Sequence, residues 1–241
     1  MHQKTIWRTF LICAALLLLP FRSAGAEEPY RVWSPPGDGL HSAVLFVPGC
    51  SGFTATNEIN VYDERASELQ SAGFLVVYVD YIGKRMQTNC AHVLQDEVGR
   101  DIIEAANWTR DQAGVDANGI AVIGWSYGGG GVLAALKAAP PPGTAITKAV
   151  MYYPVCRGAP PWSGSVTGLM LLGAKDDIAM PALCERLAKD IPPERLHVII
   201  YPNARHGFDM RGFPADAPSG APAYNAEAAT ASWAAVVEFL K

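Results

Sequence analysis

Six short apolar runs, rich in β-branched residues, are expected to form strands. Several of them, such as Phe74–Val79, are apolar throughout instead of alternating with polar residues. Strands that are buried on both faces of a parallel sheet have this pattern. The six runs are Ala43–Val47, Phe74–Val79, Ile120–Gly124, Lys148–Tyr153, Leu169–Leu172 and Leu196–Tyr201.

Longer segments between these runs repeat apolar residues at helical spacing. Between residues 94 and 112, for example, apolar side chains recur every four residues and fall on one face. The predicted helices are Val61–Ala72, Leu94–Gln112, Gly128–Ala138, Pro181–Lys189 and Ala223–Leu240. This alternation predicts one α/β domain, a mostly parallel central sheet with helices on both faces. Pro- and Gly-rich stretches at 34–39, 140–143, 157–164 and 212–222 are expected to be connections.

The amino-terminal segment has the order of a secretory signal. Lys4 and Arg8 are followed by the apolar run Phe10–Leu19 and by the small residues Ala24-Gly25-Ala26. We expect residues 1–26 to be a cleaved signal peptide and residues 27–241 to be the mature domain. A membrane anchor is the alternative, but a spanning helix needs about 20 apolar residues. The expected location is therefore the periplasm or the extracellular space.

Charge and cysteine content limit the partners of the mature chain. Three of the 19 Lys and Arg residues lie in residues 1–26, so 16 remain against 23 acidic residues, a net charge of −7. This balance does not favour nucleic acid or an anionic membrane surface, and we expect no stable membrane insertion after signal removal. An even number of cysteines in an exported protein favours disulfides, and no pair has zinc-site spacing, so no metal is expected. Cys13 lies in the expected signal peptide, so the mature chain keeps Cys50, Cys90, Cys156 and Cys184.

One motif carries candidate chemistry. Gly124-Trp125-Ser126-Tyr127-Gly128 follows a predicted strand and precedes a predicted helix. This is the setting of a nucleophile elbow, where glycines flank a serine held in a strained turn. The helix amino terminus that follows favours developing negative charge. The motif predicts Ser126 as a nucleophile; the alternative is a glycine-rich packing turn.

A serine nucleophile needs a base and an orienting acid, which follow it in the chain order Ser, acid, His. His41 and His92 precede Ser126, and His197 lies inside a predicted strand. His206 instead follows that strand at its carboxyl end, the edge where catalytic groups of a parallel sheet gather. We therefore predict His206 as the base.

The acid and the oxyanion donors are expected after other strands. Asp176 and Asp177 follow the strand Leu169–Leu172. Two backbone N–H groups should hold the oxyanion, one from Tyr127 after the nucleophile and one from an early loop, which we assign to Cys50.

These strings resemble the dienelactone hydrolase family of the α/β-hydrolase superfamily, over most of residues 40–240. The resemblance rests on Pro-Gly-Cys-Ser-Gly at 48–52, the stretch 80–90 with Arg85, and the elbow. It also rests on Tyr-Pro-Val-Cys at 153–156, Gly-Ala-Lys-Asp-Asp at 173–177 with Cys184, and His-Gly-Phe-Asp at 206–209. The best-studied members use a cysteine nucleophile and a glutamate in the early loop, where this chain has Ser126 and Gly49. The departure favours a general ester hydrolase over a dienelactone-specific one.

The resemblance implies two further assignments. It pairs Cys50 with Cys90 and Cys156 with Cys184, where spacing alone leaves three connectivities. Members of this fold commonly place the acid three residues after the glycine that ends the strand, here Asp176. Counting four residues back from Pro181 gives Asp177 instead, so Asp177 stays the alternative acid, otherwise solvated or capping the next helix.

We therefore predict a serine esterase without a cofactor, acting on a small-molecule ester. Thioesterase or peptidase activity on the same triad, a non-catalytic exported binding protein and a cell-envelope structural protein are the alternatives. Few residues separate Tyr153 from the next strand, so no large cap domain is expected. Four aromatic residues are candidate pocket walls, although each could equally be core: Tyr81, Trp125, Trp162 and Phe208.

Overall fold

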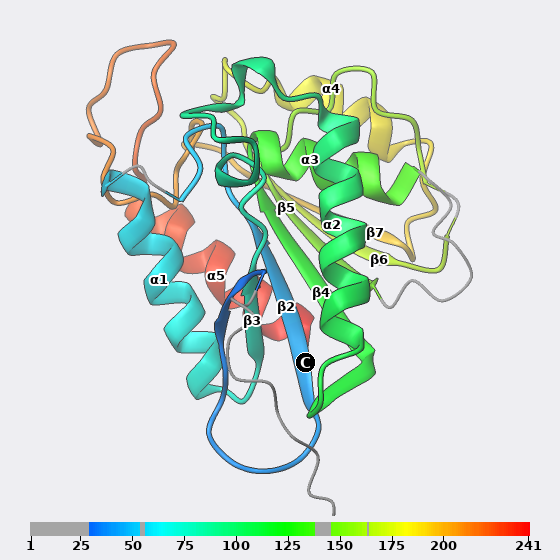
Figure 1. The fold of residues 1–241 in the computed structure, drawn as a ribbon. Helices are drawn as coiled ribbons and strands as arrows, with labels where there is room; N and C mark the ends of the chain where they lie inside the picture. Colours follow the sequence, from blue (N-terminus) through cyan, green and yellow to red (C-terminus); the bar gives the residue numbers. More distant parts are fainter. Residues whose placement is uncertain (1–28, 54–55, 138–145, 163) are drawn as a thin grey trace, which may run out of the picture.

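The structure, a computed structural model, describes residues 29–53, 56–137, 146–162 and 164–241. A seven-stranded sheet lies at its centre (Figure 1). β1 pairs antiparallel with β3, and every other neighbouring pair is parallel. In spatial order the strands are β1 (Arg31–Trp33), β3 (Leu75–Tyr78), β2 (His41–Val47), β4 (Val115–Trp125), β5 (Ile146–Tyr152), β6 (Thr167–Gly173) and β7 (Leu196–Tyr201).

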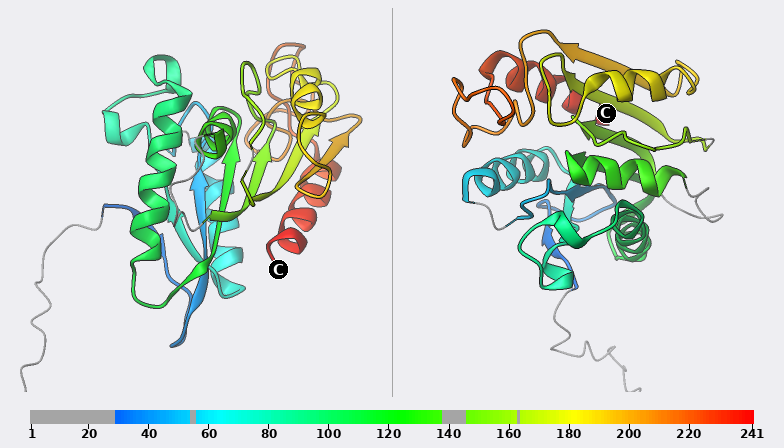
Figure 2. Two further views of the ribbon diagram at one scale, coloured as in Figure 1. Left: turned by 90° about the vertical axis from the view of Figure 1, so that its right-hand side faces the viewer. Right: turned by 90° about the horizontal axis from the view of Figure 1, so that it is seen from above.

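Helices cover both faces of the sheet (Figures 1 and 2). One face carries α2 (Gln95–Arg110), α3 (Tyr127–Lys137) and α4 (Pro181–Ala188), and the other carries α1 (Thr56–Ser71) and α5 (Ala226–Leu240). Alternate side chains of a strand point to opposite faces, so each central strand contributes to both cores. This is why the strand sequences are apolar throughout.

The predicted elements are present, with shifted ends. β4 begins five residues before the predicted Ile120, and α5 begins at Ala226 instead of Ala223. The helix starts there because the Asn225 side chain accepts a hydrogen bond from the N–H of Ala228. β1 was not predicted, because three residues at a sheet edge leave no apolar run.

Some predictions concern residues outside the described ranges. They are the signal peptide of residues 1–26 and the connection at 140–143. In the part of the chain that the structure describes, no helix has the length and apolar character needed to cross a membrane.

The strand order places a crevice beside β2. The chain moves from β2 to β3 on one side and later returns to β4 on the other side. Ligands of open α/β sheets bind at the carboxyl ends of strands where the order reverses in this way. The loops after β2 and β4 are therefore the expected walls of a site.

Two disulfides hold the loops at this end of the sheet. Cys50 is bonded to Cys90 and Cys156 to Cys184, as the resemblance implied. The first joins the loop after β2 to the segment after β3, and the second joins the loop after β5 to α4.

Candidate active site

Ser126 stands in a sharp turn between β4 and α3. Its φ is 51°, in the left-handed region that non-glycine residues rarely adopt, and its N–H donates to the carbonyl of Tyr152 at 2.9 Å. A Cβ on Gly124 would lie 2.7 Å from the carbonyl oxygen of Gly128, and one on Gly128 would lie 2.3 Å from that of Pro48. Glycine is thus required on both sides of Ser126, as expected of a nucleophile elbow.

His206 lies beside Ser126 although 80 residues separate them. The Ser126 Oγ and the His206 Nε2 are 2.8 Å apart. His206 is buried and follows β7, and Gly207 beside it takes a φ of 68° that turns the chain. The other candidates lie elsewhere: His197 is exposed on β7, and the Nδ1 of His41 contacts the carbonyl of Gly73.

The adjacent carboxylates Asp176 and Asp177 have different environments. Asp176 is buried; its Oδ2 lies 2.8 Å from the Nδ1 of His206, and its Oδ1 accepts hydrogen bonds from the N–H groups of Ile178 and Ala179. Asp177 is exposed, and its Oδ2 accepts from the hydroxyl of Ser219 and the N–H of Gly220. These two hydrogen bonds lower the pKa of Asp177. Asp177 therefore does not cap α4, whose first residue follows an uncapped Met180.

A cavity of about 350 Å³ lies beside Ser126. Ser126 and His206 form part of its wall, together with the loop after β2. Most of the remaining wall is apolar or aromatic and comes from several separate segments of the chain. The wall residues are Gly49, Cys50, Ser51, Tyr62, Trp125, Tyr153, Ile178, Gly207, Met210, Phe213 and Pro222.

Of the four aromatic residues proposed as walls, only Trp125 lines this cavity. The prediction was wrong for Trp162, whose indole N–H donates to the carbonyl of Val166, and for Phe208, which lies fully inside the core. Tyr81 lines a different cavity. Sequence reasoning missed Tyr62 and Phe213, because an aromatic residue in a helix or loop gives no local sign of the cavity it faces.

A buried carboxylate, Asp209, connects two walls of the cavity. Its Oδ1 accepts from the hydroxyl of Tyr153 at 2.5 Å and its Oδ2 from the indole N–H of Trp125 at 2.9 Å. Burial raises the pKa of Asp209, while these two hydrogen bonds act to lower it. The Tyr153 ring in turn packs on the His206 ring, with centroids 4.7 Å apart. The motif His-Gly-Phe-Asp at 206–209 supports the family resemblance, but nothing in its sequence pattern indicates this role for Asp209.

The two predicted oxyanion donors lie at the ends of different elements. Tyr127 is the first residue of α3, so its N–H has no partner inside that helix. Cys50 lies in the loop after β2 and lines the cavity. Among the described residues, neither backbone N–H donates a hydrogen bond to another part of the chain.

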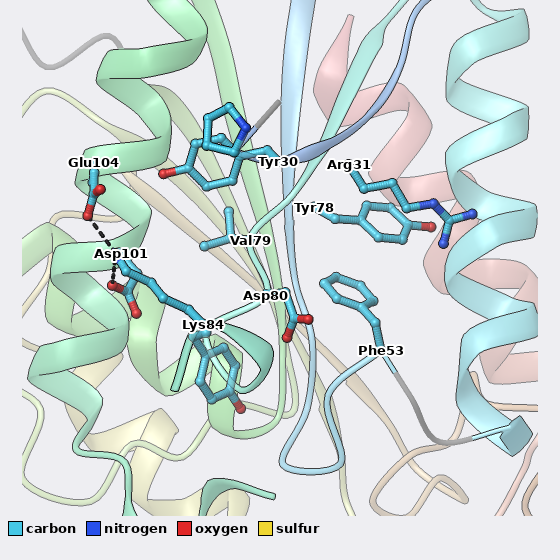
Figure 3. A pocket seen from close by; sticks show the side chains of 11 residues that line it. Tyr30, Arg31, Phe53, Tyr78, Val79, Asp80, Lys84, Asp101 and Glu104 are labelled. Atoms are coloured by element: carbon cyan, nitrogen blue, oxygen red, sulfur yellow. Dashed lines mark hydrogen bonds and ion pairs between the residues drawn. The ribbon is translucent and has the colours of Figure 1, made fainter. Parts of the chain in front are cut away.

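A second, larger cavity of about 740 Å³ lies beyond the loop after β2 (Figure 3). On one side of it Lys84 forms ion pairs with Asp101 and Glu104, and Phe53 and Tyr78 lie on the other side. None of the residues that line it belongs to the Ser126–His206–Asp176 cluster. Across the described ranges, no group of His, Cys, Asp and Glu side chains is arranged to hold a metal ion.

Comparison with known proteins identifies the family. A model of the dienelactone hydrolase family matches residues 35–241. No curated protein sequence matches the chain.

Solved structures share the fold. A candidate dienelactone hydrolase from Klebsiella pneumoniae is 17% identical with a TM-score of 0.65, over 85% of this chain and 88% of that chain. A dienelactone hydrolase-like promiscuous phosphotriesterase from metagenomic libraries is 23% identical with a TM-score of 0.63, over 85% and 87%. Esterase 2 of Thermogutta terrifontis, phosphorylated by paraoxon, is 16% identical with a TM-score of 0.62, over 87% and 86%. The fold is thus that of the α/β-hydrolases, and the chain belongs to the dienelactone hydrolase family of hydrolases acting on ester bonds.

Proposed function

We propose that this chain is an exported carboxylesterase with Ser126 as nucleophile, His206 as base and Asp176 as acid. One observation carries the proposal: a continuous chain of hydrogen bonds opens into the smaller cavity. The Ser126 Oγ lies 2.8 Å from the His206 Nε2, and the His206 Nδ1 lies 2.8 Å from the Asp176 Oδ2. These distances are within the range in which a base can remove the hydroxyl proton.

The acid determines which imidazole nitrogen carries the proton. A carboxylate only accepts hydrogen bonds, so the Asp176 Oδ2 favours the tautomer with a proton on Nδ1. Nε2 is then free to accept the proton of Ser126 as its Oγ attacks the ester carbonyl. The imidazolium so formed donates its Nε2 proton to the departing alcohol, and water releases the acyl group in a second cycle of the same steps. The two backbone N–H groups on the Asp176 Oδ1 hold the carboxylate in this orientation.

The negative charge of the tetrahedral intermediate needs two donors beside Ser126. We assign these to the backbone N–H groups of Tyr127 and Cys50. The first lies at the amino terminus of α3, where the helix dipole also favours negative charge. Donors already fixed in place are effective because they need no reorganisation during the reaction.

The smaller cavity favours an uncharged ester with short acyl and alcohol groups. Its volume of about 350 Å³ is near the lower end of the usual range for ligand sites. His206 is the one ionisable side chain in its wall besides Tyr62 and Tyr153, and no Lys or Arg lines it in the described part of the chain. Arg85, part of the family resemblance, instead pairs with Asp101. An anionic substrate would therefore meet no compensating charge.

The compartment is a further part of the proposal. The pattern of residues 1–26 supports a signal peptide, and two disulfides are compatible with an oxidising environment. Amino-terminal sequencing of protein recovered from the periplasm should begin at Glu27; a chain that keeps Met1 would contradict cleavage.

The enzymatic proposal is tested by replacing the nucleophile. Ser126→Ala removes one hydroxyl from a partly exposed turn, so the fold should be unaffected while kcat on p-nitrophenyl butyrate falls by up to about a million-fold. Steady-state kinetics measure the loss, and circular dichroism confirms the fold. Near-normal turnover by a folded Ser126→Ala enzyme would refute the mechanism.

A further inference from the structure

The backbone carbonyl of Gly49 accepts a buried hydrogen bond that comes from outside its own loop. Its donor is the hydroxyl of Tyr81, 2.9 Å away and 32 residues later in the chain. Tyr81 follows β3 and has no exposed surface, so the hydroxyl is held in place by the core around it. A buried hydrogen bond between a side chain and a distant loop restricts the loop strongly.

The bonded carbonyl belongs to the peptide that carries a proposed oxyanion donor. The Gly49 oxygen and the Cys50 nitrogen are part of one planar unit, and no cis peptide bond occurs among the described residues. In a trans peptide the C=O and the N–H point in opposite directions. Tyr81 lines the larger cavity, whereas Gly49 and Cys50 line the smaller cavity that contains Ser126. Fixing the oxygen toward Tyr81 therefore turns the Cys50 N–H away from Tyr81.

We infer that Tyr81 is a positioning residue for the oxyanion hole. The inference rests on the proposed function, because it assumes that the Cys50 N–H stabilises the tetrahedral intermediate. Tyr81 would act in two ways: it fixes the plane of the Gly49–Cys50 peptide, and it polarises the carbonyl, which strengthens the N–H as a donor. Tyr81 itself does not touch the substrate.

The neighbouring peptides are held by other groups. The Gly49 N–H, in the preceding peptide, donates to the hydroxyl of Tyr62 at 3.0 Å. The Cys50 carbonyl, in the following peptide, accepts from the Cys90 N–H at 2.9 Å, beside the disulfide. The Gly49 carbonyl also accepts from the N–H of Gly52, in its own loop, at 3.1 Å. Tyr81 is thus the side-chain partner that ties the peptide carrying the donor to another part of the chain.

The test compares Tyr81→Phe with Tyr78→Phe. Each variant loses one hydroxyl from a buried ring, but the Tyr78 hydroxyl donates to Asp63 and not to the loop after β2. Kinetics use p-nitrophenyl butyrate, paraoxon counts the reactive serines, and an aryl trifluoromethyl ketone measures affinity for the tetrahedral state. Ser126 Oγ adds to the ketone carbonyl and its proton passes to His206, leaving an oxyanion.

We expect Tyr81→Phe to lower kcat per reactive site by about ten- to a hundredfold, less than complete loss of a donor. Affinity for the ketone should fall by a similar factor, while KM changes by less than about threefold, because the oxyanion donors act on the transition state more than on the ester. Tyr78→Phe should match the parent in all three measurements.

If Ser126→Ala is inactive, three outcomes would overturn the inference about Tyr81 and leave the proposed function intact. They are an unchanged kcat in Tyr81→Phe, a reduced kcat with unchanged affinity for the ketone, and an equal loss in Tyr78→Phe. A parent protein that neither hydrolyses the ester nor reacts with paraoxon would instead refute the proposed function, and the inference with it.

Discussion

The two cavities on either side of the loop after β2 differ in what their polar groups face. The larger, about 740 Å³, contains more charge, but its charged groups pair with one another or with neighbours. Lys84 forms ion pairs with Asp101 and Glu104, and Arg31 forms one with Asp63. The smaller, about 350 Å³, has almost no charge in its wall.

What distinguishes the smaller cavity is the orientation of the polar groups around it. The serine hydroxyl, the imidazole and the carboxylate form one line of hydrogen bonds that ends at the cavity, and the assigned N–H donors have no partner in the described chain. Volume alone would select the larger cavity instead. Groups already oriented toward a missing reactant are the better indicator of chemistry, because such preorganisation is what lowers a reaction barrier.

The strongest test of this contrast separates the two adjacent carboxylates. In Asp176→Asn the amide oxygen can keep the bonds from Ile178 and Ala179, which leaves the NH₂ facing the His206 Nδ1. His206 must then carry its proton on Nε2 and cannot accept one from Ser126. We expect kcat to fall by up to about ten-thousand-fold.

Asp177→Asn is the matched control. Asp177 contacts Ser219 and Gly220 and lies outside the line of hydrogen bonds, so kcat should stay close to that of the parent. Steady-state kinetics of both variants give the two kcat values to be compared. The reverse ranking would show that the acid had been assigned to the wrong residue.

Replacing the two disulfides one at a time should distinguish an effect on stability from an effect on catalysis. Cys50–Cys90 and Cys156–Cys184 span 40 and 28 residues, for which the chain-entropy model gives about 3.5–4 kcal/mol each as an upper estimate. Replacing either pair with alanine should lower the free energy of unfolding by a similar amount in urea titrations. Only the loss of Cys50–Cys90 should also reduce kcat, by about tenfold, because it loosens the oxyanion loop. Equal kcat values for the two double variants would contradict this role.

The smallest effect is expected in the larger cavity. Lys84 is 46% exposed, so its ion pairs are screened by solvent. Lys84→Met should change the free energy of unfolding by less than about 1 kcal/mol. Asp101 keeps its bond to Arg85, and kcat on p-nitrophenyl butyrate should be unchanged. A large loss of activity would show that the larger cavity takes part in the reaction.

The sequence was most informative where a local pattern has one physical cause. Strands buried on both faces are apolar throughout, and the glycines around Ser126 are required by contacts below 3 Å, so both could be predicted. The choice of Asp176 over Asp177 came from a rule about the end of β6. It agrees with the geometry because Gly173 fixes that strand end: a Cβ there would lie 2.6 Å from the Ala204 carbonyl oxygen.

Features that depend on packing between distant segments could not be predicted. Asp209 meets Trp125 across 84 residues, and Tyr81 meets Gly49 across 32, with no periodicity to signal either contact. The prediction that Trp162 and Phe208 line the cavity was wrong for the same reason. Both are aromatic residues near loops, but the core surrounds them. The short edge strand β1 has too few residues to form a pattern.

The most direct test of the central claim is covalent labelling of the mature protein with a fluorophosphonate, followed by peptide mass spectrometry. We expect one modified residue, Ser126, at near-complete stoichiometry, and no labelling of folded Ser126→Ala. An absence of labelling in the parent, or a label on another residue that persists in Ser126→Ala, would contradict the assignment of Ser126 as the nucleophile.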